Sequence, residues 1–309
     1  MDSLIKFNGK PLEKLFDVIS NGIGTLYRPR SIRKEADAKA YEIIAIEKAK
    51  KIAEGEGRLI EADYLDRMNE RIVAKEMNRQ KNIDDIVEEA GRILENENEI
   101  SEAPVEPDWT VRFFDIIQDV SDMEMKSLWS RILAGEVKTP NSYSKRTLEL
   151  LRNLSKEEAT LFVKIAQYVL QHGDFFIFRG INDNLEKFGI SYSDIAKLTE
   201  IGLIQSGSFV NMNFNNPKKI KREVGISYGG LILLLKMEDT IDKVSIPVYC
   251  LTTAGIELYK LIDVKPNIDY IRELNKEIKK EGVSLEYSKI KSGNLGEGIS
   301  YFLPTHKLD

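Results

Sequence analysis

Lys218, Lys219, Lys221 and Arg222 place four cations within five residues, and this is the part of the sequence whose chemistry best suits a nucleic acid. A loop that carries such side chains beside a nucleic acid backbone uses them to contact phosphates. Exposed cations also protect the edge of a sheet from pairing with another chain. The cluster therefore leaves a nucleic-acid contact and a solvated loop as open alternatives.

Residues typical of catalytic and metal sites are scarce. The sequence contains one Cys and two His, which argues against disulfides, structural zinc and His-centred relays. Cys250 lies among apolar residues and is predicted to be a core side chain, and His172, directly before Gly173, is predicted to cap a helix end. No Gly-x-x-x-x-Gly-Lys loop occurs, so we expect no cofactor, metal site or catalytic residue. An enzyme with an unrecognised carboxylate or nucleotide site stays an alternative.

The elements that position these residues belong to a chain of 309 residues, of which 42% are hydrophobic and 31% are charged. This length suggests about two domains. The net charge of -5 gives no chain-wide attraction to nucleic acid or to an anionic membrane. Residues 1–24 lack the pattern of a secretory signal, and the most apolar run, residues 229–235, is too short to span a bilayer. We therefore expect a cytoplasmic protein.

Residues 1–96 are predicted to form a helical hairpin or bundle, with helices over 31–54, 59–80 and 83–94. Before them, an apolar stripe at helical spacing is followed by arginines. This surface could mediate self-association or bind a protein partner, lie on an anionic membrane, or pack inside the chain. Its members are Leu12, Leu15, Phe16, Ile19, Ile23, Leu26, Arg28, Arg30 and Arg33.

Residues 97–108 are predicted to be an acidic linker, because helical periodicity fails there and Pro104 and Pro107 appear. The segment lies in an acidic stretch: residues 81–125 hold 14 acidic and 3 basic side chains, or -11, which leaves +6 for the rest of the net -5. A solvated linker with an acidic helix face explains this charge, and a docking site for a basic partner is the alternative.

The remaining chain predicts an α+β protein, with a helical module over 109–171 and a winged-helix-like domain over 172–309. In the module, a helix opened by residues 121–124 is predicted to end at Gly135. In the second part we predict a helix over 191–200 and strands over 203–214 and 226–235. The basic cluster falls between those strands, so residues 215–224 would be the wing.

Several segments resemble a bacterial domain-of-unknown-function family, number 2806. They are residues 23–33, Asp108–Asp115, Leu128–Glu136, Ser142–Glu149 and Leu251–Leu258. The segment Leu128–Ala134 is also similar to the abortive-infection alpha family, whose name implies a role against phage. The resemblance implies a bacterial cytosolic protein linked to defence, and it supplies no catalytic residues.

Together these observations predict a non-enzymatic interaction protein that self-associates through its N-terminal helices and acts in anti-phage defence. The absent catalytic motifs and the apolar stripe motivate this prediction. A winged-helix DNA-binding regulator that uses residues 218–222 is the alternative. Its presumed recognition helix argues against it, because Lys197 is its single cation beside Asp194 and Glu200.

Overall fold

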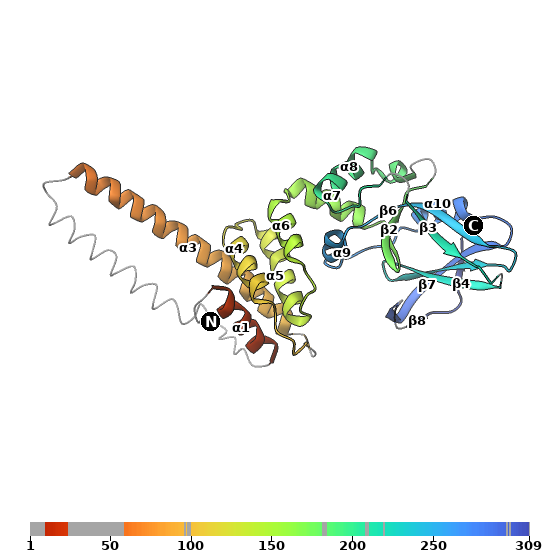
Figure 1. Cartoon of the computed structure of the whole chain (residues 1–309), viewed down its shortest axis with the longest axis horizontal. Helices are drawn as coiled ribbons and strands as arrows, with labels where there is room; N and C mark the ends of the chain where they lie inside the picture. The colour runs from red at the N-terminus through yellow and green to blue at the C-terminus, as the bar shows by residue number, and fades with distance from the viewer. Residues whose placement is uncertain are drawn as a thin grey trace. The chain divides into compact units, whose positions relative to one another are not determined.

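The computed structural model describes residues 10–23, 59–95, 97, 100–180, 184–207, 210–218, 220–294, 296 and 298–308, without the side chains of residues 23, 59–66, 69, 184 and 294. The chain divides into two compact units, Met1–Leu148 and Glu149–Asp309. Helices make up the described part of unit 1, whereas unit 2 combines helices with an antiparallel sheet (Figure 1). The protein therefore has the predicted α+β class.

Unit 1 is built from helices that surround one apolar core. They are α1 (Lys10–Ile23), α3 (Leu59–Glu95), α4 (Pro107–Ile117), α5 (Met123–Lys138) and the start of α6 (Lys145–Asn153). Helix α1 packs against α3, α4 and α5. At Gly22, an added Cβ would lie 2.2 Å from Cδ2 of Phe114. Gly22 therefore continues the helix and allows α1 to pack closely against α4 at this point.

Aromatic side chains fill the centre of unit 1. The rings of Trp109 and Phe113 stack with centroids 4.9 Å apart, and Phe113 meets Trp129 edge-on at 5.6 Å. These geometries are favourable for aromatic pairs. All three residues belong to segments that carried the family resemblance, so those segments form the core of this unit.

The predicted end of a helix at Gly135 is wrong, because α5 continues to Lys138. Gly135 instead faces the ring of Tyr143, and an added Cβ would lie 2.9 Å from Cε2 of that ring. The next residue, Glu136, is 1% exposed and accepts hydrogen bonds from the backbone N–H groups of Asn141 and Tyr143. A buried carboxylate with these partners holds the turn that follows α5.

Helix α3 is continuous over 37 residues, whereas the sequence predicted two shorter helices. At the predicted break, Asn82 stays helical and donates a side-chain hydrogen bond to the carbonyl of Gln118. Beyond this point Ile83, Ile86 and Val87 are buried in the core. Tertiary packing therefore stabilises a continuous helix across residues 81–82, where the sequence pattern alone predicted a helix boundary.

The predicted linker, residues 97–108, runs within unit 1. The backbone N–H of Ser101 donates to the carbonyl of Lys138, and the carbonyl of Ser101 accepts from Lys14 Nζ at 2.8 Å. Val105 is buried, and Pro107 is the first residue of α4. This segment is thus anchored to both α1 and α5.

Unit 2 carries a sheet whose described strand pairs are all antiparallel, in the order β3-β6-β2-β1-β4-β5-β7-β8, with β9 also paired to β7. The strands are β1 (Val169–His172), β2 (Asp174–Phe178), β3 (Val210–Asn215), β4 (Arg222–Tyr228), β5 (Leu231–Met237), β6 (Lys243–Cys250), β7 (Val283–Asn294), β8 (Gly298–Tyr301) and β9 (His306–Lys307). Its helices are α7 (Lys156–Ala166), the short η1 (Asn184–Phe188), α8 (Tyr192–Ile201), α9 (Thr253–Tyr259) and α10 (Ile268–Ile278).

The single strand predicted over 226–235 is wrong. It is a hairpin, in which Tyr228 of β4 pairs with Leu231 of β5 across Gly229 and Gly230. Both glycines have positive φ, 49° and 83°, a combination that a two-residue turn between twisted strands requires. The turn thus divides the predicted strand into two, and its two glycines are the only signal of this turn in the sequence.

His172 does not cap a helix, because α7 ends at Ala166 and His172 is the last residue of β1. Its Nδ1 lies 2.9 Å from the carbonyl oxygen of Gly225, and its ring lies 5.2 Å from that of Phe214. Cys250 is buried as predicted, and burial raises the pKa of its thiol. Both residues are part of the packing of unit 2.

Candidate functional site

The basic cluster lies on a connection between two strands that do not pair with each other. Residues 216–221 join β3, at one edge of the sheet, to β4, which pairs with β1 and β5. The sequence predicted that residues 215–224 form a wing between two paired strands. The structure differs, because the strands on either side of this segment do not pair with each other. The strand that pairs with β3 is β6, with Asn215 opposite Lys243.

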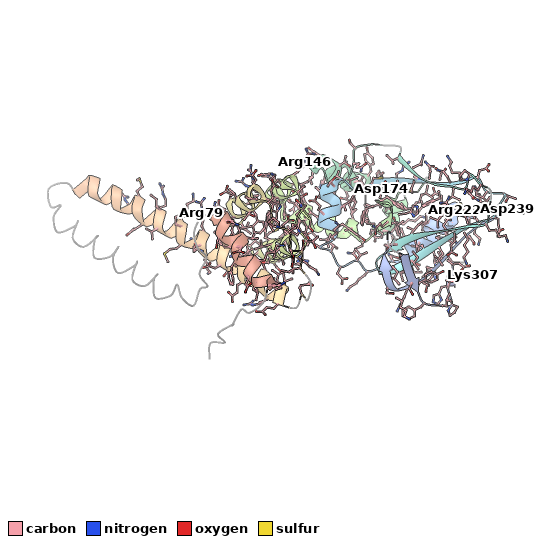
Figure 2. All side chains as sticks on the ribbon, turned by 60° about the horizontal axis from the view of Figure 1, so that its bottom comes forward. Arg79, Arg146, Asp174, Arg222, Asp239 and Lys307 are labelled. Carbon is pink, nitrogen blue, oxygen red and sulfur yellow. The ribbon has the colours of Figure 1, made fainter. Side chains whose placement is uncertain are left out.

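Two of the four predicted cations are engaged within the chain. Lys221 Nζ lies 3.1 Å from Oε2 of Glu238, and Arg222 donates a hydrogen bond to the carbonyl of Asn215. Arg222 lies at the same end of the sheet as Asp239 (Figure 2). Lys218 is exposed, and Lys219 lies outside the described residues. The cluster therefore presents less free positive charge than its sequence indicates.

Helix α8 would be the recognition helix in the DNA-binding alternative, and its exposed face has mixed charge. Tyr192, 68% exposed, stands at its first position, followed by exposed Lys197 and Glu200. Asp194 closes a capping box with Ser191, whose backbone N–H bonds the carboxylate and lowers its pKa. With an anion at each end, this face offers little attraction for a phosphate backbone.

The apolar stripe of α1 is used inside unit 1. Leu12, Leu15 and Ile19 are each less than 5% exposed, and Phe16 is half-buried. These side chains pack in the core of unit 1, so they are not available to a membrane or to a second chain. The side chain of Ile23 and the predicted residues Leu26, Arg28, Arg30 and Arg33 lie outside the described residues.

The first half of α3 carries an exposed apolar surface. Met68 is 37% exposed and Ile72 is 48% exposed, four residues apart on one helix face. Met77, on the same half, is 49% exposed. Figure 1 shows this half of α3 extending away from α1, α4 and α5, whereas its second half packs against α5. These apolar side chains therefore face solvent.

The acidic stretch of residues 81–125 is neutralised in part within unit 1. Lys126 Nζ lies 2.9 Å from Asp85, and Lys138 Nζ lies 2.6 Å from Glu97. A hydrogen bond to Glu106 raises the pKa of Lys145. Arg79 of α3 (Figure 2) bonds both carboxylate oxygens of Asp119, a bidentate geometry with fixed orientation. These ion pairs and hydrogen bonds thus link different segments of unit 1 to one another.

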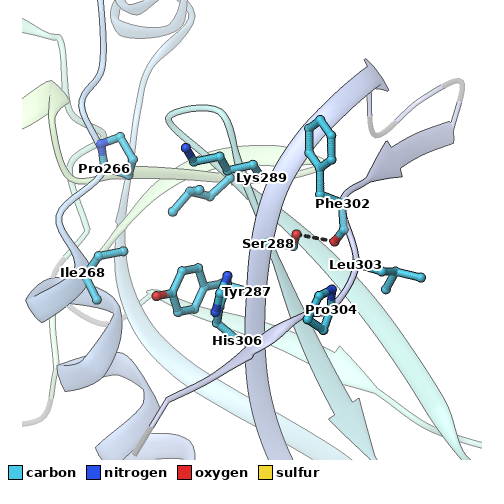
Figure 3. A pocket seen from close by; sticks show the side chains of 10 residues that line it. Pro266, Ile268, Tyr287, Ser288, Lys289, Phe302, Leu303, Pro304 and His306 are labelled. Carbon is cyan, nitrogen blue, oxygen red and sulfur yellow. Dashed lines mark hydrogen bonds between the residues drawn. The ribbon is translucent and has the colours of Figure 1, made fainter.

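A surface pocket of about 500 Å³ lies in unit 2 beside the C-terminal strands. Its floor is β7, and its walls come from the start of α10 and from the segment between β8 and β9 (Figure 3). The sequence offered no signal for it, because residues from four separate parts of the chain form it. Its residues are Leu231, Pro266, Ile268, Tyr287, Ser288, Lys289, Phe302, Leu303, Pro304 and His306.

The rings of Tyr287 and His306 lie together in this pocket, with centroids 5.2 Å apart and an interplanar angle of 33°. Figure 3 shows them between Ile268 on one side and Pro304 on the other. The segment 302–305 is held against β7, because Phe302 N–H donates to the carbonyl of Lys289 and Ser288 Oγ donates to the carbonyl of Phe302. The pocket wall is therefore an ordered part of the sheet edge.

Within the described part of the chain, no group of three or more His, Cys, Asp or Glu side chains is placed to hold a metal ion. Within the same part, no helix is long and apolar enough to cross a membrane.

Comparison with known proteins identifies the family of the chain. The sequence model of a family described as "Protein of unknown function (DUF2806)" matches residues 66–275. The match covers more than half of the 309 residues, including the aromatic core of unit 1 and most of the sheet. No curated protein and no solved structure matches the chain. The chain therefore belongs to the DUF2806 family.

Proposed function

We propose that this chain is an interaction protein that assembles with a second copy of itself through the exposed first half of α3. The observation that carries the proposal is the pair Met68 and Ile72, which are apolar, exposed and aligned on a helix anchored at its other end. Helices that bury such a stripe against each other are stabilised by removing apolar surface from water.

Charge complementarity favours a second copy as the partner. Residues 67–80, the segment of α3 that contains Met68 and Ile72, hold four basic and two acidic side chains, so this segment carries +2. Residues 81–125 carry -11, with 14 acidic and 3 basic side chains. The segment 67–80 of one copy can therefore meet the acidic region of another, and two such contacts close a symmetric dimer. Added salt should weaken the assembly.

Light scattering on the purified full chain tests the proposal. The wild type should have about twice the monomer mass of 35.3 kDa, and Ile72→Glu should have the monomer mass. Val163→Glu on α7 is the matched control, since Val163 is 47% exposed and Ile72 is 48% exposed. A monomeric wild type, or an Ile72→Glu variant with the wild-type mass, would overturn the proposal.

Point changes on α3 are a sharper test than deleting the N-terminal residues. A deletion of residues 1–57 would remove α1, and Leu15 and Ile19 of that helix fill the core of unit 1. Loss of such side chains costs several kcal/mol, roughly 2–5 each, and would unfold the unit. A changed mass would then report unfolding instead of a lost interface.

For unit 2, we propose that residues 156–251 form a winged helix that serves packing or protein contact. The order α7, β2, η1, α8, β3, β6 and the strand order β3-β6-β2 support this arrangement. The pair β3 and β6 would then be the wing, with the β4–β5 hairpin and β1 beside it as additions. The engaged cations near β4 and the mixed charge of α8 favour protein contact over DNA binding.

A role in anti-phage defence is part of the same proposal. It is motivated by the sequence resemblance inferred for Leu128–Ala134, to a family whose name implies a role against phage. Expression of the wild type in a phage-sensitive bacterium should lower the number of plaques, and Ile72→Glu should restore it. Equal plaque numbers with and without the wild-type chain would contradict this role.

A further inference from the structure

The pocket beside β7 has a positive charge balance. Lys289 and His306 are among its lining residues, and none of the ten is a carboxylate. The nearest acidic residue along β7, Glu286, is bonded by Lys236 Nζ at 2.7 Å and by the hydroxyl of Thr305. Asp269, next to Ile268, pairs with Arg272 at 2.7 Å. The carboxylates that flank the pocket in sequence are therefore already compensated.

The start of α10 adds to this balance. Pro266 and Ile268 line the pocket at the N-terminal end of this 11-residue helix, where backbone dipoles favour negative charge. Asn267, the N-cap residue, accepts from the N–H groups of Asp269 and Tyr270 and so holds this end in place. An anionic group in the pocket would meet both the helix end and the Lys289 ammonium.

The other walls suit a flat apolar group. Tyr287 and His306 present two neighbouring rings tilted by 33° to each other, and Leu231, Ile268 and Pro304 add aliphatic surface. Phe302, 53% exposed, stands at the rim. A volume of about 500 Å³ falls in the range of small-molecule sites, roughly 300–1,000 Å³. The ligand that binds such a pocket most favourably has a ring that stacks on Tyr287 and displaces water from the aliphatic side chains.

We propose that this pocket binds a small molecule that combines a flat aromatic ring with one anionic group. The ring lies among Tyr287, Ile268 and Pro304, and the anion lies near Lys289. Carboxylate, sulfonate and phosphate share this chemistry, so the site is defined by the pairing of ring and charge. The proposal does not depend on assembly through α3, because the pocket lies wholly in unit 2.

The experiment uses two fluorescent probes of similar shape on the full-length protein. One is 1-anilinonaphthalene-8-sulfonate, which has the ring and the anion, and the other is N-phenyl-1-naphthylamine, which lacks the anion. Lys289→Gln should weaken the sulfonate probe about two- to fivefold, as expected for an exposed charge contact, and leave the uncharged probe unchanged. Ile268→Trp should weaken both probes by filling the pocket.

Lys291→Gln is the matched control, because Lys291 is an exposed lysine of β7 outside the lining residues. It should bind both probes like the wild type. Lys289 is itself exposed, so Lys289→Gln keeps the fold, and its circular dichroism should match the wild type. If Lys289→Gln and Lys291→Gln bind the sulfonate probe equally, the anion site is wrong. If Ile268→Trp folds and binds both probes like the wild type, the pocket is not the binding site.

Discussion

Lys126 Nζ lies 2.9 Å from Oδ2 of Asp85, and this ion pair joins α5 to α3 inside unit 1. The two partners differ in exposure: the Lys126 side chain is 7% exposed and that of Asp85 is 24% exposed. A charge that loses its partner costs more free energy where water cannot reach it. Replacing Asp85 therefore leaves a buried charge without its partner, whereas replacing Lys126 leaves a more exposed charge.

This asymmetry predicts that Asp85→Asn destabilises unit 1 more than Lys126→Met. Asp85→Asn strands a buried ammonium and should lower the free energy of unfolding by about 2 kcal/mol, whereas Lys126→Met leaves a partly hydrated carboxylate and should cost about 1 kcal/mol. Tryptophan fluorescence during urea unfolding measures this, since the only two tryptophans of the sequence, Trp109 and Trp129, lie in unit 1. The reverse order of the two variants would contradict the prediction.

Gly255 of α9 should tolerate no side chain. An added Cβ would lie 2.2 Å from the carbonyl oxygen of Leu203, a backbone atom that cannot move aside cheaply. Gly255→Ala should therefore lower the stability of unit 2 by about 2 kcal/mol, despite the better helix propensity of alanine. Scanning calorimetry measures the shift. Gly207→Ala is the control, because its Cβ would meet only Cγ2 of Val210 at 3.5 Å. Equal transition temperatures for the two variants would refute the clash.

The stability of unit 2 should fall in acid, in part through Glu286. Hydrogen bonds from Lys236 and Thr305 lower the pKa of this carboxyl below its ordinary 4.5. As the pH falls through 4.5, the unfolded chain takes up the proton first, so protonation favours unfolding. The contribution is present above that pH and is lost below it.

Glu286→Gln tests this dependence. The variant should be less stable than the wild type by about 1 kcal/mol at neutral pH, because it loses charge-assisted hydrogen bonds. The difference should shrink in acid, and calorimetry from neutral pH to below the glutamate pKa follows it. A gap between the two proteins that stays constant with pH would show that the ionised carboxylate of Glu286 does not contribute.

The basic cluster should not confer DNA binding. Lys221 is paired with Glu238 and Arg222 is bonded to the carbonyl of Asn215, so we expect no gel shift of duplex DNA by the wild type at low salt. The variant with Lys218, Lys219, Lys221 and Arg222 changed to Ala should behave in the same way. A salt-sensitive shift by the wild type that this variant loses would establish the DNA-binding alternative instead.

Local patterns in the sequence, such as helix caps and apolar stripes, predicted those helices that are specified by residues close together in the chain. The helix predicted over residues 191–200 is α8, which a capping box of Ser191 and Asp194 opens, and the apolar spacing of Leu12, Leu15 and Ile19 identified α1. These predictions hold because a cap or an amphipathic face is encoded within a few residues. No comparable signal identified the pocket, whose walls come from residues 231, 266–268, 287–289 and 302–306.

The sequence by itself determined the α+β class, the buried Cys250 and the apolar stripes of the helices, because composition and periodicity are local properties. Only the tertiary structure decided which stripe is covered: Ile19 is buried and Ile72 is exposed, although both look alike in sequence. It also decided that β3 pairs with β6 and not with the strand that follows it. Strand pairing and burial depend on contacts between residues far apart in the chain. The sequence of one segment alone does not specify which distant segment it will contact.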